Sequence, residues 1–123
     1  MTYERQELGK TGEDLAVGEL TAEGYAIVAR RYRTRFGEID IIAREGDTVV
    51  FVEVRRKSGL GCGAAAESVT RDKQRRVVRM AVDYLARHGL YETCAVRFDV
   101  VAIDDQPDGP PRITLIRSAF ECP

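Results

Sequence analysis

Several residue types that often mark metal, redox or membrane proteins are rare or absent in this sequence. Its 123 residues include no tryptophan, one histidine and three cysteines. No stretch approaches the roughly 18–20 consecutive apolar residues of a membrane helix. The N-terminus, from Met1 to Glu7, is polar and unlike a secretory signal, so we expect a cytoplasmic protein without membrane contact.

The sequence also lacks an excess of positive or of negative residues. Lys and Arg number 19 against 20 Asp and Glu, which gives a formal net charge of -1 and an isoelectric point near 5.9. This balance argues against a protein that coats nucleic acid through bulk charge, but it leaves room for a local basic surface.

The cysteines form no recognisable metal or redox motif. Cys62, Cys94 and Cys122 are widely spaced and include no C-x-x-C pair. Together with His88 they could in principle supply four zinc ligands, but the paired spacing of such ligands is missing. Three reduced thiols in a cytoplasmic protein are the simpler interpretation.

The remaining composition, with 44% hydrophobic and 32% charged residues, is typical of a globular protein. At this length we expect one domain, residues 1–123, with a core at about residues 9–120. The hydrophobic periodicity predicts an α/β fold with a single mixed β-sheet and flanking helices, in the order α-β-β-β-α-β-β. The predicted elements are a helix from about residue 11 to Gly24, strands at 25–32, 37–44 and 47–57, a helix at 71–88, and strands at 96–103 and 112–116.

The second helix has the clearest boundaries. Thr70 is its predicted N-cap, Asp72 lies favourably in its first turn, and His88-Gly89 closes it. Its predicted apolar stripe consists of Val77, Met80, Ala81, Tyr84 and Leu85.

Glycine is concentrated before this helix, where residues 58–66 are expected to form a flexible loop. Gly59 to Ala64 matches the G-x-G-x-x-A pattern of dinucleotide-binding folds. The acidic residue expected about twenty positions later would be Asp83, which falls inside the second helix rather than at a strand end. The favoured interpretation is therefore a flexible loop beside a groove that binds nucleic acid, rather than a dinucleotide-binding turn.

Two acidic residues interrupt otherwise apolar strands: Asp40 lies between two isoleucines and Glu53 between two valines. Because side chains alternate along a strand, Glu38, Asp40 and Ile42 should share one face, and Ile39 should lie on the other. On the next strand, the face bearing Glu53 also carries Val49, Phe51, Arg55 and Lys57.

The hairpin turn sets how the two carboxylates meet. If Glu45 and Gly46 form a two-residue turn, Asp40 lies opposite Phe51 and Glu53 is its diagonal neighbour. Diagonal residues lie about 7–8 Å apart at the backbone, close enough for both carboxylates to reach one ion.

Such a pair suits Mg²⁺ or Mn²⁺, which binds hard carboxylate oxygens and activates water for phosphodiester cleavage with the help of a nearby cation. The simpler alternative is a solvated cross-strand ladder of charges formed by Glu38, Glu53, Arg55 and Lys57. The metal site is favoured because an unpaired charge in a sheet covered by helices would be costly.

Several short motifs occur in a distinctive order between about residues 9 and 120: Gly12-Glu13 at a helix start, Tyr32–Arg35 followed by Gly37–Asp40, Phe51–Val54, Lys73–Arg76, Tyr84-Leu85, Arg97–Val100 and Ala119-Phe120. This order resembles the YraN family, small bacterial proteins classed as predicted endonucleases. The resemblance implies the PD-(D/E)xK core of restriction endonucleases and Holliday-junction resolvases. It further implies that Asp40 and Glu53 are metal ligands and that Glu13 is a candidate third acid.

One position departs from the family pattern. Where the family has Glu-Val-Lys, this chain has Glu53, Val54 and Arg55, so an arginine replaces the catalytic lysine. Arginine can bind phosphate as a fork, but it cannot copy a compact, deprotonatable amine. Lys57 on the same strand face and Lys73 on the second helix are the candidates for that cation.

Basic residues cluster before the strand that begins at Gly37, at the end of the next strand and at the start of the second helix. We expect these clusters to form a groove that contacts nucleic-acid phosphates, with Tyr25 and Tyr32 available for base stacking. The alternative is an ordinary solvated helix face. The expected nucleic-acid contacts are Arg33, Arg35, Arg56, Lys73 and Arg76.

Together these features favour a Mg²⁺- or Mn²⁺-dependent endonuclease that acts on structured, branched DNA. The two strand carboxylates would hold the metal, with help from Glu13 or Glu38, and Arg55 or Lys57 would contact the scissile phosphate. A nucleic-acid-binding module without cleavage is the first alternative, and a scaffold that binds a protein through the Phe51 sheet face is the second. A resolvase-like activity would also favour a homodimer, because a junction offers two equivalent strands.

Overall fold

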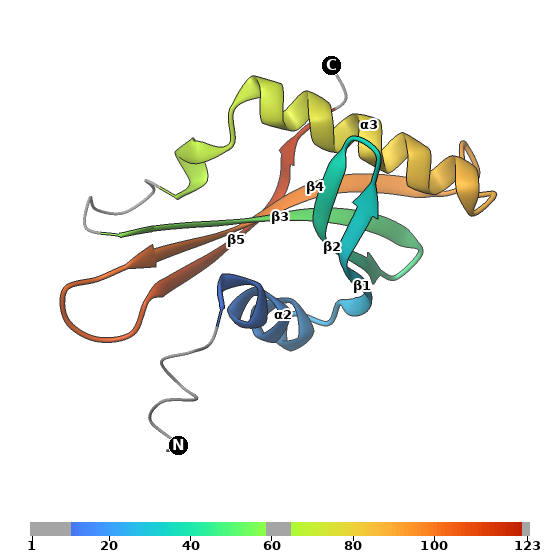
Figure 1. The fold of residues 1–123 in the computed structure, drawn as a ribbon. Coiled ribbons are helices and arrows are strands. Elements are labelled where there is room, and N and C mark those ends of the chain that lie inside the picture. Colours follow the sequence, from blue (N-terminus) through green and yellow to red (C-terminus); the bar gives the residue numbers. More distant parts are fainter. Residues whose placement is uncertain (1–10, 59–64, 122–123) are drawn as a thin grey trace, which may run out of the picture.

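The computed structural model describes residues 11–58 and 65–121. The elements within them follow in the order helix, three strands, helix, two strands, which confirms the predicted mixed α/β fold (Figure 1). The helices are α2 (Gly12–Ala22) and α3 (Arg71–Arg87), with a short 3-10 helix η1 (Ala66–Ser68) before α3. The strands are β1 (Ala26–Thr34), β2 (Gly37–Glu45), β3 (Thr48–Ser58), β4 (Ala95–Asp105) and β5 (Arg112–Phe120).

The five strands form one mixed sheet in the order β1-β2-β3-β4-β5. Every neighbouring pair is antiparallel except β3 and β4, which are parallel along their whole length. Parallel strands need a crossover connection, and α3 supplies it. The central strand β3 is therefore hydrogen-bonded on both sides, and it carries Glu53.

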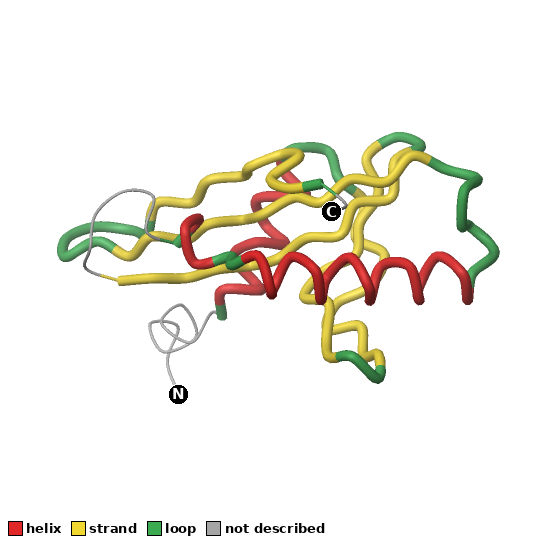
Figure 2. The backbone as a smooth tube through the Cα atoms, turned by 90° about the horizontal axis from the view of Figure 1, so that it is seen from above, coloured by secondary structure: helices red, strands yellow, loops and turns green. Residues whose placement is uncertain are grey.

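One helix covers each face of the sheet (Figures 1 and 2). The stripe predicted on α3 is buried as expected and packs on Phe51 and Phe98, whereas α2 packs Leu20 against Val50 and Val52 on the opposite face. Phe51 is 0% exposed beneath α3, so the hypothesis that its sheet face binds a protein partner is wrong.

Both helices begin with a threonine N-cap, of which only Thr70 was predicted. The Thr11 hydroxyl and the Asp14 carboxylate each accept a hydrogen bond from the other residue's backbone N–H, which forms a capping box at the start of α2. The Thr70 hydroxyl accepts from the N–H of Lys73 at the start of α3, and His88 is the C-cap, as predicted.

The register predicted between β2 and β3 is wrong by two residues. The turn consists of Gly46 and Asp47, with Glu45 paired to Thr48 and Ile42 paired to Phe51. Gly46 has a φ of 60° at the first turn position, where a tight hairpin also accepts glycine. A register shift of two residues keeps each side chain on the same face of the sheet. The shift therefore does not separate Asp40 from Glu53.

A second correction concerns Ile39. It packs with Ile42 in the cluster beneath α3, whereas Ile41 packs on the α2 side, so the side-chain alternation of β2 breaks at Asp40. Figure 1 shows the β1–β2 turn rising toward α3 beyond this point. The site residue Asp40 therefore lies where β2 leaves the regular sheet.

The expected flexible loop, residues 58–66, lies mostly outside the described residues; of its ends, Ser58 completes β3 and Ala66 begins η1. Cys62 and Cys122 also lie outside them, and Cys94 is a free thiol. Within residues 11–58 and 65–121, no helix combines the length and the apolar character needed to cross a bilayer.

Candidate functional site

Asp40 and Glu53 meet where the pairing of β2 and β3 ends. The last backbone pair is Ile41 with Val52, and one further step would place the two acids directly opposite each other. Beyond this pair, a side chain replaces the backbone as acceptor: Asp40 Oδ2 accepts a hydrogen bond of 2.8 Å from the N–H of Val54. The predicted carboxylate pair is therefore present, as an opposed pair rather than a diagonal one.

Glu53 is the most unusual residue of this pair. Its side chain is 0% exposed, and neither carboxylate oxygen accepts a hydrogen bond from the described part of the chain. Burial, together with the negative charge of Asp40, raises the pKa of Glu53 to about 7 although the Lys73 ammonium opposes this shift. A carboxylate in this state lacks the partners that a buried charge normally has.

Asp40 is less buried and has one fixed partner. Burial raises the pKa of its carboxyl, and the hydrogen bond from Val54 and the positive charge of Lys73 oppose that shift. Since each acid lies in the field of the other, a cation bound between them would relieve both.

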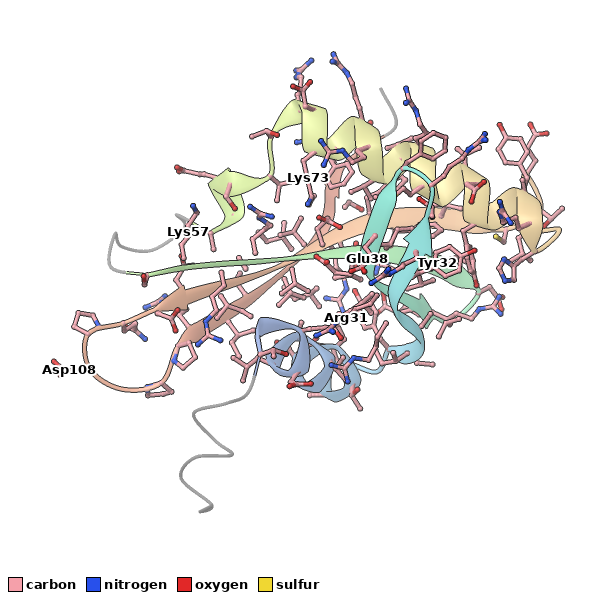
Figure 3. All side chains as sticks on the ribbon, in the orientation of Figure 1. Arg31, Tyr32, Glu38, Lys57, Lys73 and Asp108 are labelled. Carbon is pink, nitrogen blue, oxygen red and sulfur yellow. The ribbon has the colours of Figure 1, made fainter. Side chains whose placement is uncertain are left out.

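The cation nearest Glu53 comes from α3. Lys73 Nζ lies 3.4 Å from Glu53 Oε1, as an ion pair rather than a geometrically defined hydrogen bond, and its side chain is 29% exposed. Figure 3 shows Lys73 reaching from α3 toward the sheet. The partly exposed Lys73 side chain thus extends from the surface to the buried carboxylate of Glu53.

Arg55 and Lys57, the two cations of β3 on the Glu53 face, are placed differently. Arg55, two residues beyond Glu53, donates from Nε to the Ser68 hydroxyl of η1 at 2.8 Å. Lys57 is exposed four residues beyond Glu53, about 13 Å along the strand, and Figure 3 shows it toward the far end of β3. Of the two candidates for the missing lysine, the structure brings Lys73 to the carboxylates and does not bring Lys57.

Glu13 lies on the first turn of α2, with its side chain 14% exposed. It accepts hydrogen bonds from Arg30 Nε at 2.7 Å and from Arg31 Nε at 2.9 Å. Arg31 has a φ of 51°, a strained backbone for a residue with a side chain, at the position that faces Asp40 across β1 and β2. Glu13 is therefore close enough to raise the pKa of Asp40, but its oxygens are engaged by arginines.

The donor set fits a Mg²⁺ ion that keeps several waters. No group of three His, Cys, Asp or Glu side chains in the described ranges is arranged to hold a metal, so Glu13 does not complete a three-acid site. Two carboxylates together with water and phosphate oxygens are nevertheless a common arrangement for Mg²⁺. The orphaned oxygens of Glu53 are the observation that supports such a ligand.

The predicted nucleic-acid contacts do not all come together. Arg33 and Arg35 lie exposed on the β1–β2 hairpin, and Arg33 pairs with Glu38 at 3.1 Å. Arg76 of α3 lies beside the same hairpin, near Gly37. Arg56 instead binds Asp105 through two hydrogen bonds of 2.8 and 2.9 Å on the α2 side of β3, away from Lys73.

The tyrosines expected to stack on bases have structural roles. Tyr25 is buried, and its hydroxyl donates to Asp99 Oδ2 at 2.7 Å. The ring of Tyr32 packs edge-on against Tyr84 with a centroid separation of 5.2 Å. Asp99 and Asp104 are buried as well, so neither contributes to an acidic surface.

Sequence reasoning did not identify several residues that shape this site. Arg30 and Arg31 appeared only as members of a basic cluster, and Ser68 carried no signal because nothing local links η1 to β3. The backbone N–H of Val54 became a partner of Asp40 only because the strand ladder ends there. These contacts depend on tertiary placement, which spacing alone does not encode.

Comparison with known proteins gives one consistent family. A family model described as uncharacterised protein family UPF0102, which is the YraN family, matches residues 12–103. A UPF0102 protein of Rhodococcus jostii (strain RHA1) is 50% identical over 113 residues, which cover 92% of this chain and 95% of that protein. The identity and coverage are the same for a UPF0102 protein of Symbiobacterium thermophilum. A UPF0102 protein of Geotalea uraniireducens is 45% identical over 118 residues, covering 96% and 92%.

Proposed function

We propose that this chain, which belongs to the uncharacterised protein family UPF0102, is a Mg²⁺- or Mn²⁺-dependent endonuclease acting on structured DNA. The observation that carries this proposal is the buried carboxylate of Glu53, which accepts no hydrogen bond from the described residues and has only the Lys73 ammonium nearby, at 3.4 Å. Leaving a buried charged acceptor unsatisfied costs about 1–3 kcal/mol or more. A cation held jointly with Asp40 would remove this penalty, and no apolar role explains a glutamate at this position.

Asp40 and Glu53 would be the ligands of the metal. The N–H of Val54 fixes Asp40 through Oδ2, which leaves Oδ1 available, and both Glu53 oxygens lack other partners among the described residues. A bound Mg²⁺ would supply a water of lowered pKa and neutralise charge on the attacked phosphate.

Lys73 would provide the cation that contacts the scissile phosphate. It is partly exposed, already lies 3.4 Å from Glu53, and carries the compact ammonium that Arg55 cannot imitate. Arg55 uses Nε on Ser68, so its terminal nitrogens are left to approach a phosphate from the same sheet face. In this proposal the lysine missing from β3 has its counterpart on the first turn of α3.

DNA would reach this site along the side where α3 and the β1–β2 hairpin meet. Arg76 on α3 and the exposed Arg33 and Arg35 on the hairpin supply positive charge there. Contacts of this kind fix the position of a phosphate backbone without reading its sequence, so recognition of DNA shape suits this surface.

The direct test is cleavage of a four-way junction and of a matched linear duplex in Mg²⁺ or Mn²⁺. We expect metal-dependent cleavage by the wild type and losses of at least about 100-fold for Asp40→Asn and Glu53→Gln, since each removes a metal ligand. Lys73→Met should lose about 10- to 100-fold, whereas Lys57→Met should cleave normally. Glu45→Gln, an acid outside the site, is the control.

Activity that survives both carboxylate substitutions would contradict the assignment. A second readout is independent of turnover: calorimetric titration with Mg²⁺ or Mn²⁺ should show binding to the wild type and none to the Asp40→Asn, Glu53→Gln double variant. Binding that is unchanged in the double variant would place the metal elsewhere.

A nucleic-acid-binding module without cleavage is the second candidate, favoured by the engagement of Arg55 with Ser68 at the position where the family has lysine. A binding module should bind a DNA junction with an affinity that falls steeply as the salt concentration rises. It should yield no cleaved DNA under any condition. The same assays separate the two functions, because only the nuclease needs both carboxylates for a chemical step.

A further inference from the structure

A groove of about 620 Å³ separates the β1–β2 turn from the outer face of α3. It is distinct from the carboxylate site, none of whose residues line it. Its lining residues are Phe36 from the turn and Arg75, Val78, Arg79, Val82, Asp83 and Ala86 from α3. Figure 2 shows the β1–β2 turn projecting beyond one side of α3.

The turn holds Phe36 in a fixed position. The backbone N–H of Phe36 donates to the Thr34 hydroxyl at 3.0 Å, and that hydroxyl donates to the carbonyl of Gly37 at 3.0 Å. Gly37 itself packs close to the Met80 sulfur on α3. The aromatic wall of the groove is therefore anchored at both ends.

Guanidinium groups lie over this aromatic ring. Arg35 and Arg79 place their Cζ atoms 5.1 and 5.3 Å from the ring centroid of Phe36. An aromatic ring flanked by arginines offers flat surfaces on which a nucleobase can stack, together with positive charge for its phosphate. The α3 wall adds the apolar side chains of Val78, Val82 and Ala86, and Val82 is 41% exposed.

The charge of the groove favours an anionic occupant. Arg35, Arg75 and Arg79 outnumber the single acid Asp83. Asp83 already pairs with Arg87 at 3.0 Å, and Arg75 contacts the exposed Asp72 at 3.5 Å. A second copy of this chain would bring the same positive excess to the interface, so electrostatic complementarity favours DNA over self-association.

The groove also lies at a suitable distance from the carboxylate site. Arg79 follows Lys73 by six residues on α3, which corresponds to a rise of about 9 Å along the helix. At about 3.4 Å per nucleotide, this spans two to three nucleotides of a B-form strand. Six residues also rotate the helix by about 600°, so Lys73 and Arg79 project from sides of α3 that lie about 120° apart. A DNA strand that occupies both sites would therefore have to pass around α3 between them.

We infer that the groove between Phe36 and α3 receives an unpaired base of a DNA strand whose backbone lies along the carboxylate site, so that the protein selects DNA with an unpaired nucleotide near the branch. This inference rests on the proposed function in that it takes DNA as the partner. It adds the feature of the DNA that is recognised and the residues that recognise it.

The test uses the full chain carrying Glu53→Gln, which blocks turnover, in a background that is otherwise wild type. Fluorescence anisotropy measures its affinity for a duplex with one unpaired adenosine at a branch, and for the same DNA with an abasic nucleotide there. We expect the base to improve binding about tenfold. Val82→Asn, which makes the groove wall polar without adding charge, should abolish this preference.

The matched control is Val28→Asn, an equally accessible valine at 46% exposure on β1, outside the groove. It should keep the tenfold preference. Phe36→Leu, which keeps apolar volume but loses the aromatic face, should reduce the preference, and circular dichroism checks that each variant is folded. A preference for the base that is unchanged in Val82→Asn and Phe36→Leu would overturn the inference, as would no binding to any DNA.

Two further outcomes separate this inference from its premise. Base-dependent binding that requires Val82, in a protein that never cleaves, would support the groove and refute the nuclease. Cleavage that requires Asp40 but ignores the base would do the reverse. A wild-type dimer by light scattering that dissociates in Val82→Asn would assign the groove to a second copy and overturn the inference.

Discussion

Two fully buried carboxylates occupy neighbouring strands of this sheet, and their surroundings differ sharply. Asp99 on β4 faces the α2 side, and Glu53 on β3 faces the α3 side. Each side chain is 0% exposed. Asp99 accepts hydrogen bonds from the Tyr25 hydroxyl, from Arg97 and from the N–H of Ser118, whereas neither Glu53 oxygen accepts one within the described residues.

The Asp99 network joins distant parts of the chain. Arg97 binds Asp99, the Tyr25 hydroxyl and Glu45, at donor–acceptor distances of 2.7 to 2.9 Å, and Arg117 of β5 also binds Glu45. Burial, with the hydrogen bond to Asp99, raises the pKa of Tyr25 to about 12, so its hydroxyl stays protonated and keeps donating. This network fixes the ends of four strands against one another.

The contrast shows which of the two acids is available to a ligand. A buried carboxylate with all its donors supplied contributes to a unique structure and has no capacity left for another partner. A buried carboxylate without donors keeps that capacity at the expense of stability. Glu53, with Asp40 and Lys73 beside it, is therefore the acid that we propose to bind a ligand, whereas Asp99 has the partners of a structural acid.

The largest expected effect comes from breaking the satisfied network. Asp99→Leu leaves the Tyr25 hydroxyl and the Arg97 guanidinium without their buried partner, so we expect the free energy of unfolding to fall by about 3–5 kcal/mol. Urea denaturation measures it, with Glu45→Gln at the rim of the network as a milder control. A loss below about 1 kcal/mol would mean that Asp99 is not a structural acid.

Glu53, which has no hydrogen-bond donor, is expected to lower the free energy of unfolding when it is ionised. Because the folded pKa of Glu53 is raised from 4.5 to about 7, the folded state binds more protons than the unfolded chain between these values. Its ionisation therefore makes the protein less stable as pH rises from about 4.5 to 7, by at most about 3 kcal/mol.

Glu53→Gln removes this penalty, so the variant should exceed the wild type by about 1–3 kcal/mol at pH 8 in metal-free buffer. The advantage should shrink toward pH 5, where the folded wild type keeps Glu53 protonated. Urea denaturation of both proteins at the two pH values measures the difference. A gap that does not change with pH would show that Glu53 stays neutral or is partnered throughout.

Adding Mg²⁺ should narrow this difference in stability between Glu53→Gln and the wild type. At tenfold excess over its dissociation constant, Mg²⁺ would stabilise the wild type by about 1.4 kcal/mol, or a few degrees in Tm. Thermal denaturation at pH 8 should show this shift for the wild type and for Asp99→Asn, provided the latter folds, but not for Glu53→Gln. Equal shifts in all three proteins would point to nonspecific ion effects.

The smallest effect is expected at the cation beside Glu53. Lys73 is 29% exposed, so Lys73→Met should change stability by less than about 1 kcal/mol, while losing its positive charge should raise the pKa of Glu53 further. A carbon-detected NMR titration of the Glu53 carboxyl measures this shift. Arg97→Met, which disrupts the Asp99 network, is the comparison and should destabilise the protein far more.

Much of the fold could be predicted from local patterns. Thr70 marked the start of the second helix because a hydroxyl before a helical run caps its free N–H groups. The interruption of apolar strands by Asp40 and Glu53 identified the two acids as unusual. The register failed because glycine fits either position of a two-residue turn, and a shift of two residues leaves the same side chains buried.

The site was predictable only in part, for a related reason. Spacing placed Asp40 and Glu53 near each other because they belong to one hairpin. Lys73 and Glu13 reach the same region through helices on opposite faces, and Tyr25 reaches Asp99 across 74 residues of sequence. Such contacts follow from how α2 and α3 pack on the sheet.

The sequence by itself determined the order of helices and strands, the caps of both helices and the pair of acids in apolar strands, because each depends on neighbours within a few residues. Only the tertiary structure decided which buried acid is satisfied. Asp99 obtains its donors from Tyr25 just before β1, from β4 and from β5, whereas Glu53 has only the ion pair with Lys73 of α3. The partners of a buried charge come from whatever the fold brings beside it, and that is a property of packing rather than of sequence spacing.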